Sequence, residues 1–437
     1  MPPDRSDDRA HDEAPAARTG YLRLADQTVA TAAVRQAPDR YTRLFEAARN
    51  QVGHARCLCR IDEVVRLVIR CRSGRYHLAN WPSGGHQHAP DCPWFRAASS
   101  LSGRSAYADA IADDDDGTSI RLSSPLVIRG ASAGGATTTG RGSTGREPTA
   151  ARGAVGLLGL VHYLWEAARL NVWSPQAGRR HWPDCHDLLR EQARDCRINH
   201  LPLAGTLWIV PPFRPADAHR INTAWERYFA RLAVTGTSRR RSLLLGEIRA
   251  LEPTTHSIRV KLAHQRTPLY APKALVDRVR RSYPAAFTAQ AAQTNRRRVL
   301  LGLIEHSPRG HAVLVDFAAM LTTATYLPAD SSHEADMADA LTAAARTFLK
   351  PLRYDRNSQV FPDFVLVDDE PETYVEVWGV LGRESYESRK RAKQTFYRTS
   401  GKSLIEWDVR TPIPDLTRQP PNGTPCRPTQ STAIPAR

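Results

Sequence analysis

Apolar and polar residues alternate most regularly toward the C-terminal end of the chain. The run "HEADMADALTAAARTFLKPL" places Met337, Leu341 and Phe348 at helical spacing and predicts a helix with Ser331 or Ser332 as N-cap. The strand-like runs "DFVLVDD" and "TYVEVWGV" follow, and the short link "EPE" predicts a hairpin. The runs "RESYESRKRAKQTFYRTSGK" and "SLIEWDV" then predict a helix and a final strand. The expected order is helix, short strand, strand, strand, helix, strand.

The middle of the chain mixes helical and strand periodicity. Leu157, Leu160 and Leu164 predict a helix over "VGLLGLVHYLWEAARLNVW", and "DCHDLLREQARDC" predicts a second helix. A helix-turn-helix and a pair of core helices are both open, and core helices are the commoner outcome. The strand-like runs "GTLWIVPPF", "SLLLGEIRAL", "HSIRVKLAH", "RVLLGLIEH" and "HAVLVDF" follow. We expect α+β structure here, with arginine clusters that suit either phosphate contacts or a solvated surface.

Composition divides the chain into segments, because three stretches are too poor in large apolar residues to repay the entropy of ordering. The fold class we expect is α+β multidomain. Its segments are a disordered 1–17, a zinc-ribbon-like β-hairpin module at 18–97, an acidic and Gly/Ser/Thr-rich linker at 98–153, a central α+β region at 154–328, a C-terminal domain at 329–410 and a disordered tail at 411–437.

The net charge indicates which kind of partner the protein binds, and the hydropathy of the chain indicates its compartment. The formal net charge of +16 favours polyanionic partners through phosphate contacts and counterion release, and nucleic acid, with DNA first, is the partner we expect. An arginine-rich composition without such a partner would give the same charge. The chain has no apolar run of about 18 residues and no basic-then-apolar leader, so the sequence predicts a cytoplasmic protein without a membrane partner.

Four of the seven cysteines lie between positions 57 and 92, a crowding that suits metal ligation better than disulfides in a reducing cytosol. A hairpin near Gly74 would bring Cys57 and Cys59 back to His88 and Cys92, and these four are the zinc ligands we predict. The alternative is unmetallated cysteines with surface histidines. His86 would have to reach further than His88 to share an ion with Cys92. We interpret Cys71 as a buried thiol within a strand. A closed four-ligand site would be structural.

The C-terminal order carries a family resemblance. With Pro362 and Asp363 heading one strand and Glu376 inside the next, it resembles the PD-(D/E)XK nuclease superfamily. The resemblance implies a restriction-endonuclease-like α/β domain with a mixed sheet flanked by helices. It also implies that Asp363 and Glu376 hold a divalent ion, Mg²⁺ or Mn²⁺, for phosphodiester hydrolysis. Oxygen ligands suit such hard ions.

One position departs from that superfamily. The lysine expected two residues after Glu376 is replaced by Trp378. Some members carry the basic residue on the following helix, where Lys393 shares a face with two tyrosines and is our choice, with Lys390 next. Glu334 on the leading helix is a candidate accessory ligand. The plain alternative is a turn-capping Asp363, an exposed Glu376 and a solvated lysine face.

A second resemblance covers about 41–410. The motifs "CLCR", "YHLANWPSGGHQHAPDC", "LVHYLWEAARLNVWSP", "LEPTTHSIRVKLAHQ" and "LRYDRNSQVFPDFVLVDD...VEVWG" resemble an uncharacterised family of domain-of-unknown-function proteins. That family is carried on bacterial conjugative plasmids and integrative elements. The resemblance implies a setting in mobile DNA, with conjugation or plasmid-maintenance proteins as partners, and no established activity.

Two functions follow as expectations. The first is a metal-dependent nuclease, or a nuclease-derived DNA-processing protein, with Asp363, Glu376 and Lys393 as its catalytic residues. The second is a non-catalytic nucleic-acid-binding or assembly protein of a conjugation system, whose nuclease fold has lost its chemistry. Trp378 is the feature that favours the second. A purely structural zinc protein is a third reading, and the charge argues against it.

Overall fold

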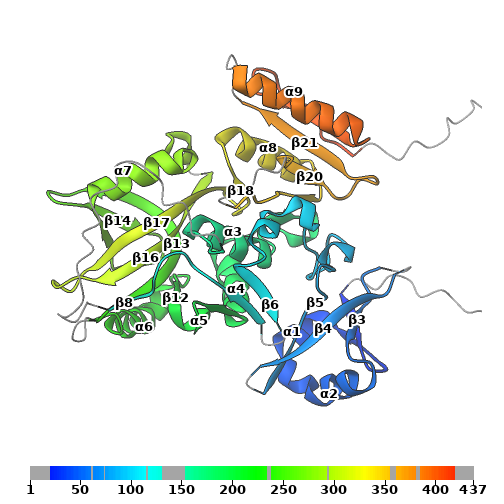
Figure 1. The fold of residues 1–437 in the computed structure, drawn as a ribbon, viewed down its shortest axis with the longest axis horizontal. Coiled ribbons are helices and arrows are strands. Elements are labelled where there is room, and N and C mark those ends of the chain that lie inside the picture. Colours follow the sequence, from blue (N-terminus) through cyan, green and yellow to red (C-terminus); the bar gives the residue numbers. More distant parts are fainter. Residues whose placement is uncertain are drawn as a thin grey trace, which may run out of the picture.

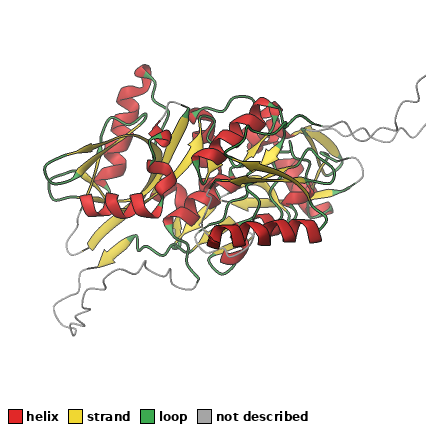
Figure 2. Ribbon diagram, turned by 90° about the horizontal axis from the view of Figure 1, so that it is seen from above, coloured by secondary structure: helices red, strands yellow, loops and turns green. Residues whose placement is uncertain are grey.

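The computed structural model describes residues 20–60, 63–72, 74–114, 117–129, 153–233, 238–292, 295–354, 361–379 and 384–418. These residues form four β-sheets with helices packed against them (Figure 1; Figure 2). The disordered 1–17 expected from the sequence lies outside them. Within the described residues, no helix is both long enough and apolar enough to cross a membrane.

The first sheet is antiparallel, in the order β2-β1-β3-β4-β5. Its strands are β1 (Tyr21–Leu24), β2 (Gln27–Ala30), β3 (Ala55–Cys57), β4 (Val65–Arg72) and β5 (Arg75–Asn80), with α1 (Thr31–Gln36) and α2 (Thr42–Gln51) beside them. Leu22, Leu24 and Leu67 alternate inward and pack against Phe45 of α2. The N-terminal module is therefore larger than the expected β-hairpin: the hairpin β4–β5 exists, but as part of a five-stranded sheet with its own core.

The second sheet corrects the expected linker at 98–153. Strands β6 (Ile111–Asp114) and β7 (Gly117–Ile120) form one sheet with β10 (Cys196–Ile198) and β11 (Leu201–Pro202), in the order β11-β10-β7-β6. Tyr107, Ile111 and Ile120 are buried in the main core of the protein, so their apolar area repays the ordering of residues 98–129. Asp113 and Asp114 of the acidic run end β6, whereas residues 115–116 and the Gly/Ser/Thr-rich residues 130–152 lie outside the described part of the chain.

Two long helices fill the centre of the molecule. Almost every residue of α3 (Leu157–Ala167) is buried, and the indole of Trp165 donates a hydrogen bond of 3.0 Å to the carbonyl of Tyr326. The second, α4 (Trp182–Arg194), buries the face that carries Trp182, Cys185 and Leu189. A helix-turn-helix joins its helices by a turn of about 3–4 residues, whereas residues 168–181, which include the strand β9 (Val172–Trp173), separate α3 from α4. The structure therefore favours core helices over a helix-turn-helix.

Five strands of the central region close into a barrel, drawn at the left of Figure 1. They are β13 (Ser238–Pro253), β14 (Ile258–Leu262), β15 (Leu269–Ala271), β16 (Arg296–His306) and β17 (Ala312–Thr323). Closure follows from the pairing: β13 pairs with both β14 and β16, and β15 runs parallel to β17. The interior is filled by leucines. Gly302 faces it, because a Cβ there would meet Leu314 at 2.4 Å.

Shorter elements surround the barrel. Strands β12 (Leu207–Ile209), β8 (Val127–Arg129) and β18 (Pro328–Ala329) extend its sheet. Helices α5 (Leu203–Thr206) and α6 (Ala218–Ala230) precede it, and α7 (Lys273–Ser282) connects β15 to β16. The expected α+β character of residues 154–328 is present, and the barrel is an arrangement that the strand runs alone did not reveal.

The C-terminal sheet is mixed, in the order β22-β21-β20-β19-β9. Its strands are β19 (Phe348–Leu349), β20 (Phe364–Leu366), β21 (Thr373–Trp378), β22 (Ser403–Asp408) and, from the central region, β9 (Val172–Trp173). β21 and β22 run parallel, whereas the other strand pairs of this sheet within the described residues are antiparallel. Helices α8 (Ser332–Ala343) and α9 (Glu384–Thr399) complete the element order expected from the sequence, and Ser331 is the N-cap of α8.

Alternation along β21 sends neighbouring residues to opposite faces of this sheet. Val375 and Val377 pack with Met337 and Leu341 of α8, whereas Tyr374 packs with Tyr397 of α9. The sheet therefore lies between the two helices. Residues 411–418 of the expected disordered tail at 411–437 are ordered, because Leu416 is buried on the α8 face and its carbonyl accepts a hydrogen bond of 3.0 Å from Arg346. Residues 419–437 lie outside the described part of the chain.

Candidate functional site

Two loops bring three cysteines and one histidine together in the N-terminal part. Cys57 ends β3 and Cys59 follows it, whereas His88 and Cys92 come after β5, beyond the short 3₁₀ turn Gly85–Gln87. The antiparallel path of β3, β4 and β5 returns the chain to its starting edge. All four side chains are buried, and their ligand atoms lie within 4.8 Å of one another.

The distances suit a single tetrahedral ion. The Sγ atoms of Cys57 and Cys92 are 3.6 Å apart, and Nδ1 of His88 lies 3.5 Å from Sγ of Cys59 and 3.4 Å from Sγ of Cys92. Zinc bonds of about 2.3 Å to sulfur and about 2.0–2.1 Å to nitrogen, at tetrahedral angles, separate two sulfurs by about 3.8 Å and sulfur from nitrogen by about 3.6 Å. The buried Cys₃His cluster could therefore hold a metal such as zinc.

The electrostatics favour a thiolate at one of these ligands. Hydrogen bonds from the Cys57 and Cys92 thiols hold the pKa of Cys59 below its usual range, and the backbone N–H of Ala89 donates to its sulfur at 3.4 Å. His86 is exposed and lies outside the cluster. Cys71 is half-buried on β4, rather than the fully buried thiol expected from the sequence.

The predicted carboxylates face each other across two paired strands. Phe364 of β20 is opposite Val375 of β21, so continuing the antiparallel register by one position sets Asp363 opposite Glu376. Directly opposed residues have Cβ atoms about 4.5–5.5 Å apart on one face of a sheet. Asp363 is 5% exposed and Glu376 is 1% exposed. The exposed Glu376 of the plain alternative is therefore wrong.

Glu376 is held by the helix on its own face of the sheet. Nζ of Lys393 lies 2.8 Å from Oε1 and 2.7 Å from Oε2 of Glu376, and the same amine donates to the carbonyl of Phe361 at 2.8 Å. The phenol of Tyr397, one turn further along α9, donates to Oε1 at 2.6 Å. The structure thus brings Lys393 to Glu376.

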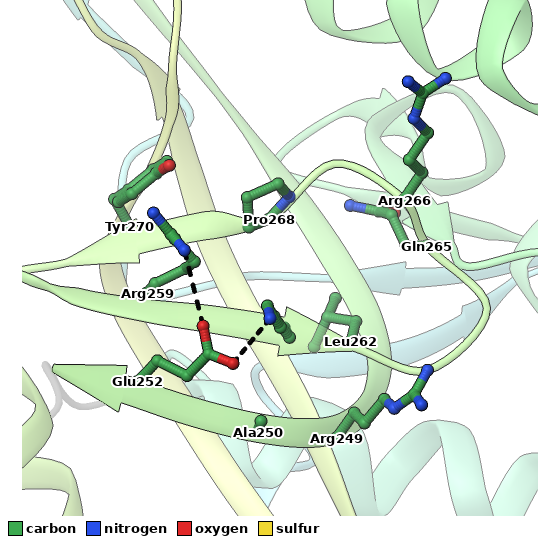
Figure 3. A pocket seen from close by; sticks show the side chains of 10 residues that line it. Arg249, Ala250, Glu252, Arg259, Leu262, Gln265, Arg266, Pro268 and Tyr270 are labelled. Atoms are coloured by element: carbon green, nitrogen blue, oxygen red, sulfur yellow. Dashed lines mark ion pairs between the residues drawn. The ribbon is translucent and has the colours of Figure 1, made fainter. Parts of the chain in front are cut away.

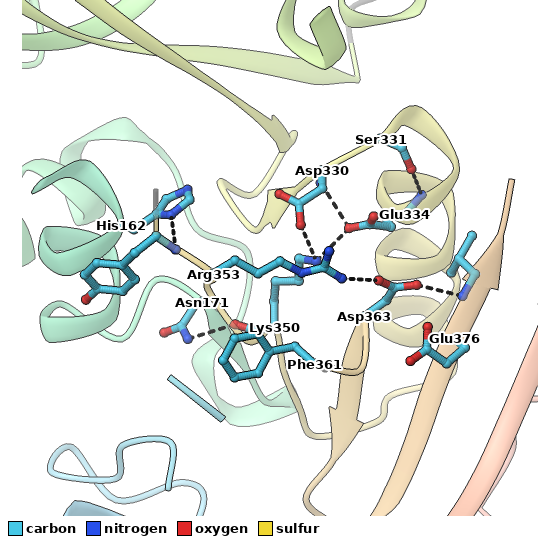
Figure 4. Close-up of polar contacts among 12 residues, drawn as sticks. His162, Asn171, Asp330, Ser331, Glu334, Lys350, Arg353, Phe361, Asp363 and Glu376 are labelled. Carbon is cyan, nitrogen blue, oxygen red and sulfur yellow. Dashed lines mark hydrogen bonds and ion pairs between the residues drawn. The ribbon is translucent and has the colours of Figure 1, made fainter. Parts of the chain in front are cut away.

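Asp363 has looser contacts on one oxygen than on the other. Its Oδ2 accepts a hydrogen bond of 2.8 Å from the backbone N–H of Val377, whereas its Oδ1 lies 3.4 Å from Nη2 of Arg353 (Figure 4). Burial raises the pKa of Asp363, and the nearby charge of Glu376 raises it further. The site therefore holds two buried carboxyl groups close together.

A second set of charges adjoins this pair. The amine of Lys350, 1% exposed, donates to Oε2 of Glu334 at 2.7 Å and to Oδ2 of Asp330 at 3.1 Å. Burial lowers the pKa of Lys350, but Asp330 and Glu334 outweigh that effect and leave it above its usual value. Figure 4 shows Arg353 reaching from this set toward Asp363. Glu334, the candidate accessory ligand, is thus an ion-pair partner of a buried lysine.

Sequence reasoning missed Lys350 and Arg353. Lys350 stands in the apolar run "TFLKPL", directly after β19, and a lysine in such a run is rarely buried without a carboxylate partner. The position of Lys350 in this run therefore indicates a buried ion pair, which the sequence analysis did not predict. Lys390, the second choice for the catalytic lysine, lies with its amine 5.1 Å from the ring centre of Trp378, whose indole donates to Glu406 at 2.9 Å.

Comparison with known proteins adds a family. The sequence profile described as "Protein of unknown function (DUF1173)" matches residues 28–409. No curated protein and no solved structure matches the chain significantly. The family match agrees with the resemblance to domain-of-unknown-function proteins, and it assigns no chemistry to the residues of the site.

Proposed function

The chain belongs to the DUF1173 family, whose function is unknown, and from its geometry we propose that it is a metal-dependent nuclease, or a nuclease-derived protein, that hydrolyses phosphodiester bonds. One observation carries the proposal. Asp363 and Glu376 are opposed on adjacent strands, with the amine of Lys393 within 2.8 Å of both oxygens of Glu376. Two carboxylates and one amine on one face are the groups that such hydrolysis uses.

The surrounding fold supports the same reading. The elements α8, β19, β20, β21, α9 and β22 follow the order of the PD-(D/E)XK superfamily, with a mixed sheet between two helices. Asp363 heads the second of these strands and Glu376 lies inside the third. Lys393 comes from the following helix, which accounts for Trp378 at the position where that superfamily carries lysine.

The residues present fit a hard divalent ion. Magnesium keeps several of its waters and needs one or two carboxylates, and Asp363 and Glu376 supply two, with Oδ1 of Asp363 the less committed oxygen. When bound, Mg²⁺ or Mn²⁺ would activate water and neutralise charge on the phosphate. Lys393 would fix the orientation of Glu376 and carry a positive charge at the site. Tyr397 would hold the second contact to Glu376.

Cleavage assays test the proposal directly. Labelled single-stranded, duplex and branched DNA would be incubated with the purified chain and Mg²⁺ or Mn²⁺, with EDTA as the metal-free arm. We expect metal-dependent cutting that falls by at least about a hundredfold in Asp363→Asn, which keeps an oxygen for the Val377 N–H. Asp277→Asn, an exposed acid on α7, is the matched control. Equal residual cutting by Asp363→Asn and wild type would mean that the activity is a contaminant.

A second function has a specific observation in its favour. Both oxygens of Glu376 are occupied by Lys393, and Tyr397 adds a third hydrogen bond, so this carboxylate is satisfied without a metal. A non-catalytic nucleic-acid-binding or assembly protein of a conjugation system would keep such a pair for stability. Calorimetric titration with Mn²⁺ separates the two: binding that disappears in Asp363→Asn supports the nuclease, and no binding by wild type supports the second function.

We also propose that the Cys₃His cluster holds a structural zinc ion. Its four ligands come from the end of β3 and the loop after β5, and they close the coordination sphere. Catalytic zinc sites keep an open position for water or substrate, whereas this cluster supplies four protein ligands. The ion would join two loops of the N-terminal sheet. The setting in mobile DNA, with DNA as the nucleic acid and conjugation proteins as partners, completes the proposal.

A further inference from the structure

The barrel carries a cleft on its outer surface, and the residues that line it are distant in sequence from Asp363 and Glu376. The cleft has a volume of about 810 Å³ and lies over β13, β14 and β15 (Figure 3). Alternation along these strands sends Val260, Leu262 and Leu269 into the barrel and turns Arg259, Lys261 and Tyr270 outward. The outward residues line the cleft, so its chemistry is set by the strand register.

The lining of the cleft is cationic. Arg249, Arg259, Lys261 and Arg266 contribute four positive charges against the single carboxylate of Glu252. Glu252 pairs with Lys261 at 2.6 Å and with Arg259 at 3.6 Å. Arg249 and Arg266 are exposed, and no carboxylate among the described residues lies within 4.0 Å of either guanidinium. Arg249 and Arg266 are therefore available to bind an anionic ligand.

An aromatic ring joins this cleft to a second hollow. Tyr270 is half-buried, with the guanidinium of Arg259 6.0 Å from its ring centre and the ring centre of His311 at 5.2 Å. The second hollow, about 460 Å³, also includes Tyr270 and lies between the β13–β14 turn at 254–257 and the β16–β17 turn at 307–311. Tyr270 thus stands where the two spaces meet.

We propose that this outer face of β13, β14 and β15 binds a single-stranded nucleic acid. Arg249 and Arg266 contact phosphates, and a base stacks on Tyr270 between the two turns. Binding of single strands combines a cationic groove along the backbone with aromatic platforms for the bases. A duplex keeps its base faces stacked inside, so it could use the arginines but not the tyrosine.

The architecture of the barrel supports this placement. Its pairing order is β13-β14-β15-β17-β16, closed back onto β13, with α7 between β15 and β16. That is a five-stranded Greek-key barrel, and barrels of this type bind oligonucleotides or oligosaccharides on the second and third strands and the adjoining loops, of which the cationic lining favours the oligonucleotide. Here the second and third strands are β14 and β15, which carry Arg259, Lys261 and Tyr270.

The inference shares with the proposed function only the assumption of a nucleic-acid partner. It requires no metal and no cleavage, and it concerns a different sheet. Binding measured in EDTA with the Asp363→Asn chain therefore tests the cleft alone. Wild-type protein that binds single strands but does not cut DNA would overturn the nuclease and leave the cleft standing. Wild-type protein that cuts DNA, while its cleft variants bind single strands as tightly as wild type does, would overturn the cleft and leave the nuclease standing.

The experiment measures fluorescence anisotropy of a labelled 20-nucleotide oligothymidine and of a 20-base-pair duplex with the full chain over a range of salt. Arg249→Ala with Arg266→Ala should weaken single-strand binding about tenfold and reduce the slope of log affinity against log salt by about 1.4, because two phosphate contacts are lost. Tyr270→Leu should weaken it at least about fivefold with an unchanged slope, and Tyr270→Phe should bind like wild type.

Matched controls come from the N-terminal sheet. Arg43→Ala with Arg49→Ala removes two exposed charges from α2, and Tyr21→Ala removes an exposed ring that is 44% accessible. Both should bind like wild type. The proposal is overturned if these controls lose as much affinity as the cleft variants, if the duplex binds more tightly than the single strand, or if neither oligonucleotide binds. The two arginines are exposed, so their removal tests binding without a folding defect.

Discussion

Glu376 shows how one buried residue shapes the site. A carboxylate that is 1% exposed has lost its water and must be compensated by hydrogen bonds or a cation. Lys393 supplies the cation and Tyr397 a third hydrogen bond. Burial raises the pKa of Tyr397, so its phenol remains a hydrogen-bond donor across the ordinary pH range. These contacts therefore compensate the burial of Glu376 without a metal ion.

Replacing Lys393 by alanine should therefore destabilise the protein. Breaking a buried pair leaves one charge uncompensated, and with the side chain of Lys393 18% exposed we expect the free energy of unfolding to fall by about 2–4 kcal/mol. Urea unfolding of wild type and variant measures the change. Adding Glu376→Gln should recover part of the loss, because it removes the orphaned charge.

The neighbouring Lys390 is the control for that measurement. Its amine lies over the ring of Trp378, at 5.1 Å, in a partly exposed contact. Lys390→Ala should cost less than about 1 kcal/mol. If the two alanine variants unfold at the same urea concentration, Lys393 does not compensate Glu376 in solution.

Glu334 makes a prediction about pH. Burial raises the pKa of this carboxyl to about 7, although Lys350 opposes the shift. The folded state then binds the proton more tightly than the unfolded state, so the stability that Glu334 contributes is full below its ordinary pKa of 4.5 and is lost as the pH rises through about 7. Relative to Glu334→Gln, wild type should lose about 2–3 kcal/mol of unfolding free energy between pH 5 and pH 7.

Thermal or urea unfolding at half-unit pH steps provides the test for Glu334. The difference between the two proteins cancels the titration of groups that they share. Two stability curves that stay parallel over this range would contradict a raised pKa in the folded state. Ser331→Ala serves as control, because it removes only the cap contact to the N–H of Glu334 at 3.1 Å and should shift the curve without changing its slope.

At the scale of elements, the Cys₃His cluster joins the N-terminal sheet to the centre of the molecule. The loop that carries His88 and Cys92 also accepts a hydrogen bond of 2.7 Å from Arg169 at the carbonyl of Pro90. A short way on, Arg96 donates to the carbonyl of Ala167, at the end of α3, at 2.7 Å. Whatever holds the four ligands together also fixes the position of this loop.

Cysteine substitutions test the metal at that loop. We expect about one zinc per purified chain, and Cys59→Ser should lower the zinc content by at least about half and lower the melting temperature. Cys71→Ser, on β4 and outside the cluster, should keep both. Metal analysis and calorimetry measure the two quantities. A fully folded wild-type protein that contains no metal would refute a structural zinc site.

At the scale of the whole molecule, segments far apart in the sequence build the surroundings of the carboxylates. Strand β9 pairs with β19, and the backbone N–H of Lys350 donates to the carbonyl of Asn171 at 2.8 Å. Phe95 and Leu101 pack with the same face of the C-terminal sheet that Tyr397 covers. The C-terminal sheet therefore depends on residues outside 329–410 for its edge and for part of its core.

Gly103 tests this long-range contact. Its N–H donates to the carbonyl of Leu352 at 2.8 Å, and a Cβ at this position would lie 2.4 Å from the carbonyl oxygen of Arg353. Backbone cannot give way as a flexible side chain can, so Gly103→Ala should cost about 1–3 kcal/mol of unfolding free energy. It should also lower any activity at Asp363, because Arg353 contacts that residue.

Gly205 is the matched control for this substitution. No atom lies within 4 Å of a Cβ built there. Gly205→Ala in α5 should leave stability unchanged or raise it slightly, since alanine is the better helix former. An equal loss of stability in both variants, measured by urea unfolding, would show that residues 98–107 do not pack against 352–353 in solution.

Sequence reasoning could reach the elements and several of the site residues. Short-range spacing predicted α3, α8, the β20–β21 hairpin and α9, because the apolar residues of each recur at helical or strand spacing within one short segment. It also chose Cys57, Cys59, His88 and Cys92, which the structure brings together. It failed over residues 98–129, where acidic and small residues concealed Tyr107, Ile111 and Ile120, three residues that reach the core.

By itself the sequence determined the local order of helices and strands, the clustering of the cysteines and the membership of a family of unknown function. Only the tertiary structure decided that β13 pairs with both β14 and β16, that Lys350 pairs with Glu334, and that β9 completes the C-terminal sheet. The reason is physical: periodicity is set between neighbours along the chain, whereas barrel closure and buried ion pairs depend on partners that the chain brings together only when it folds.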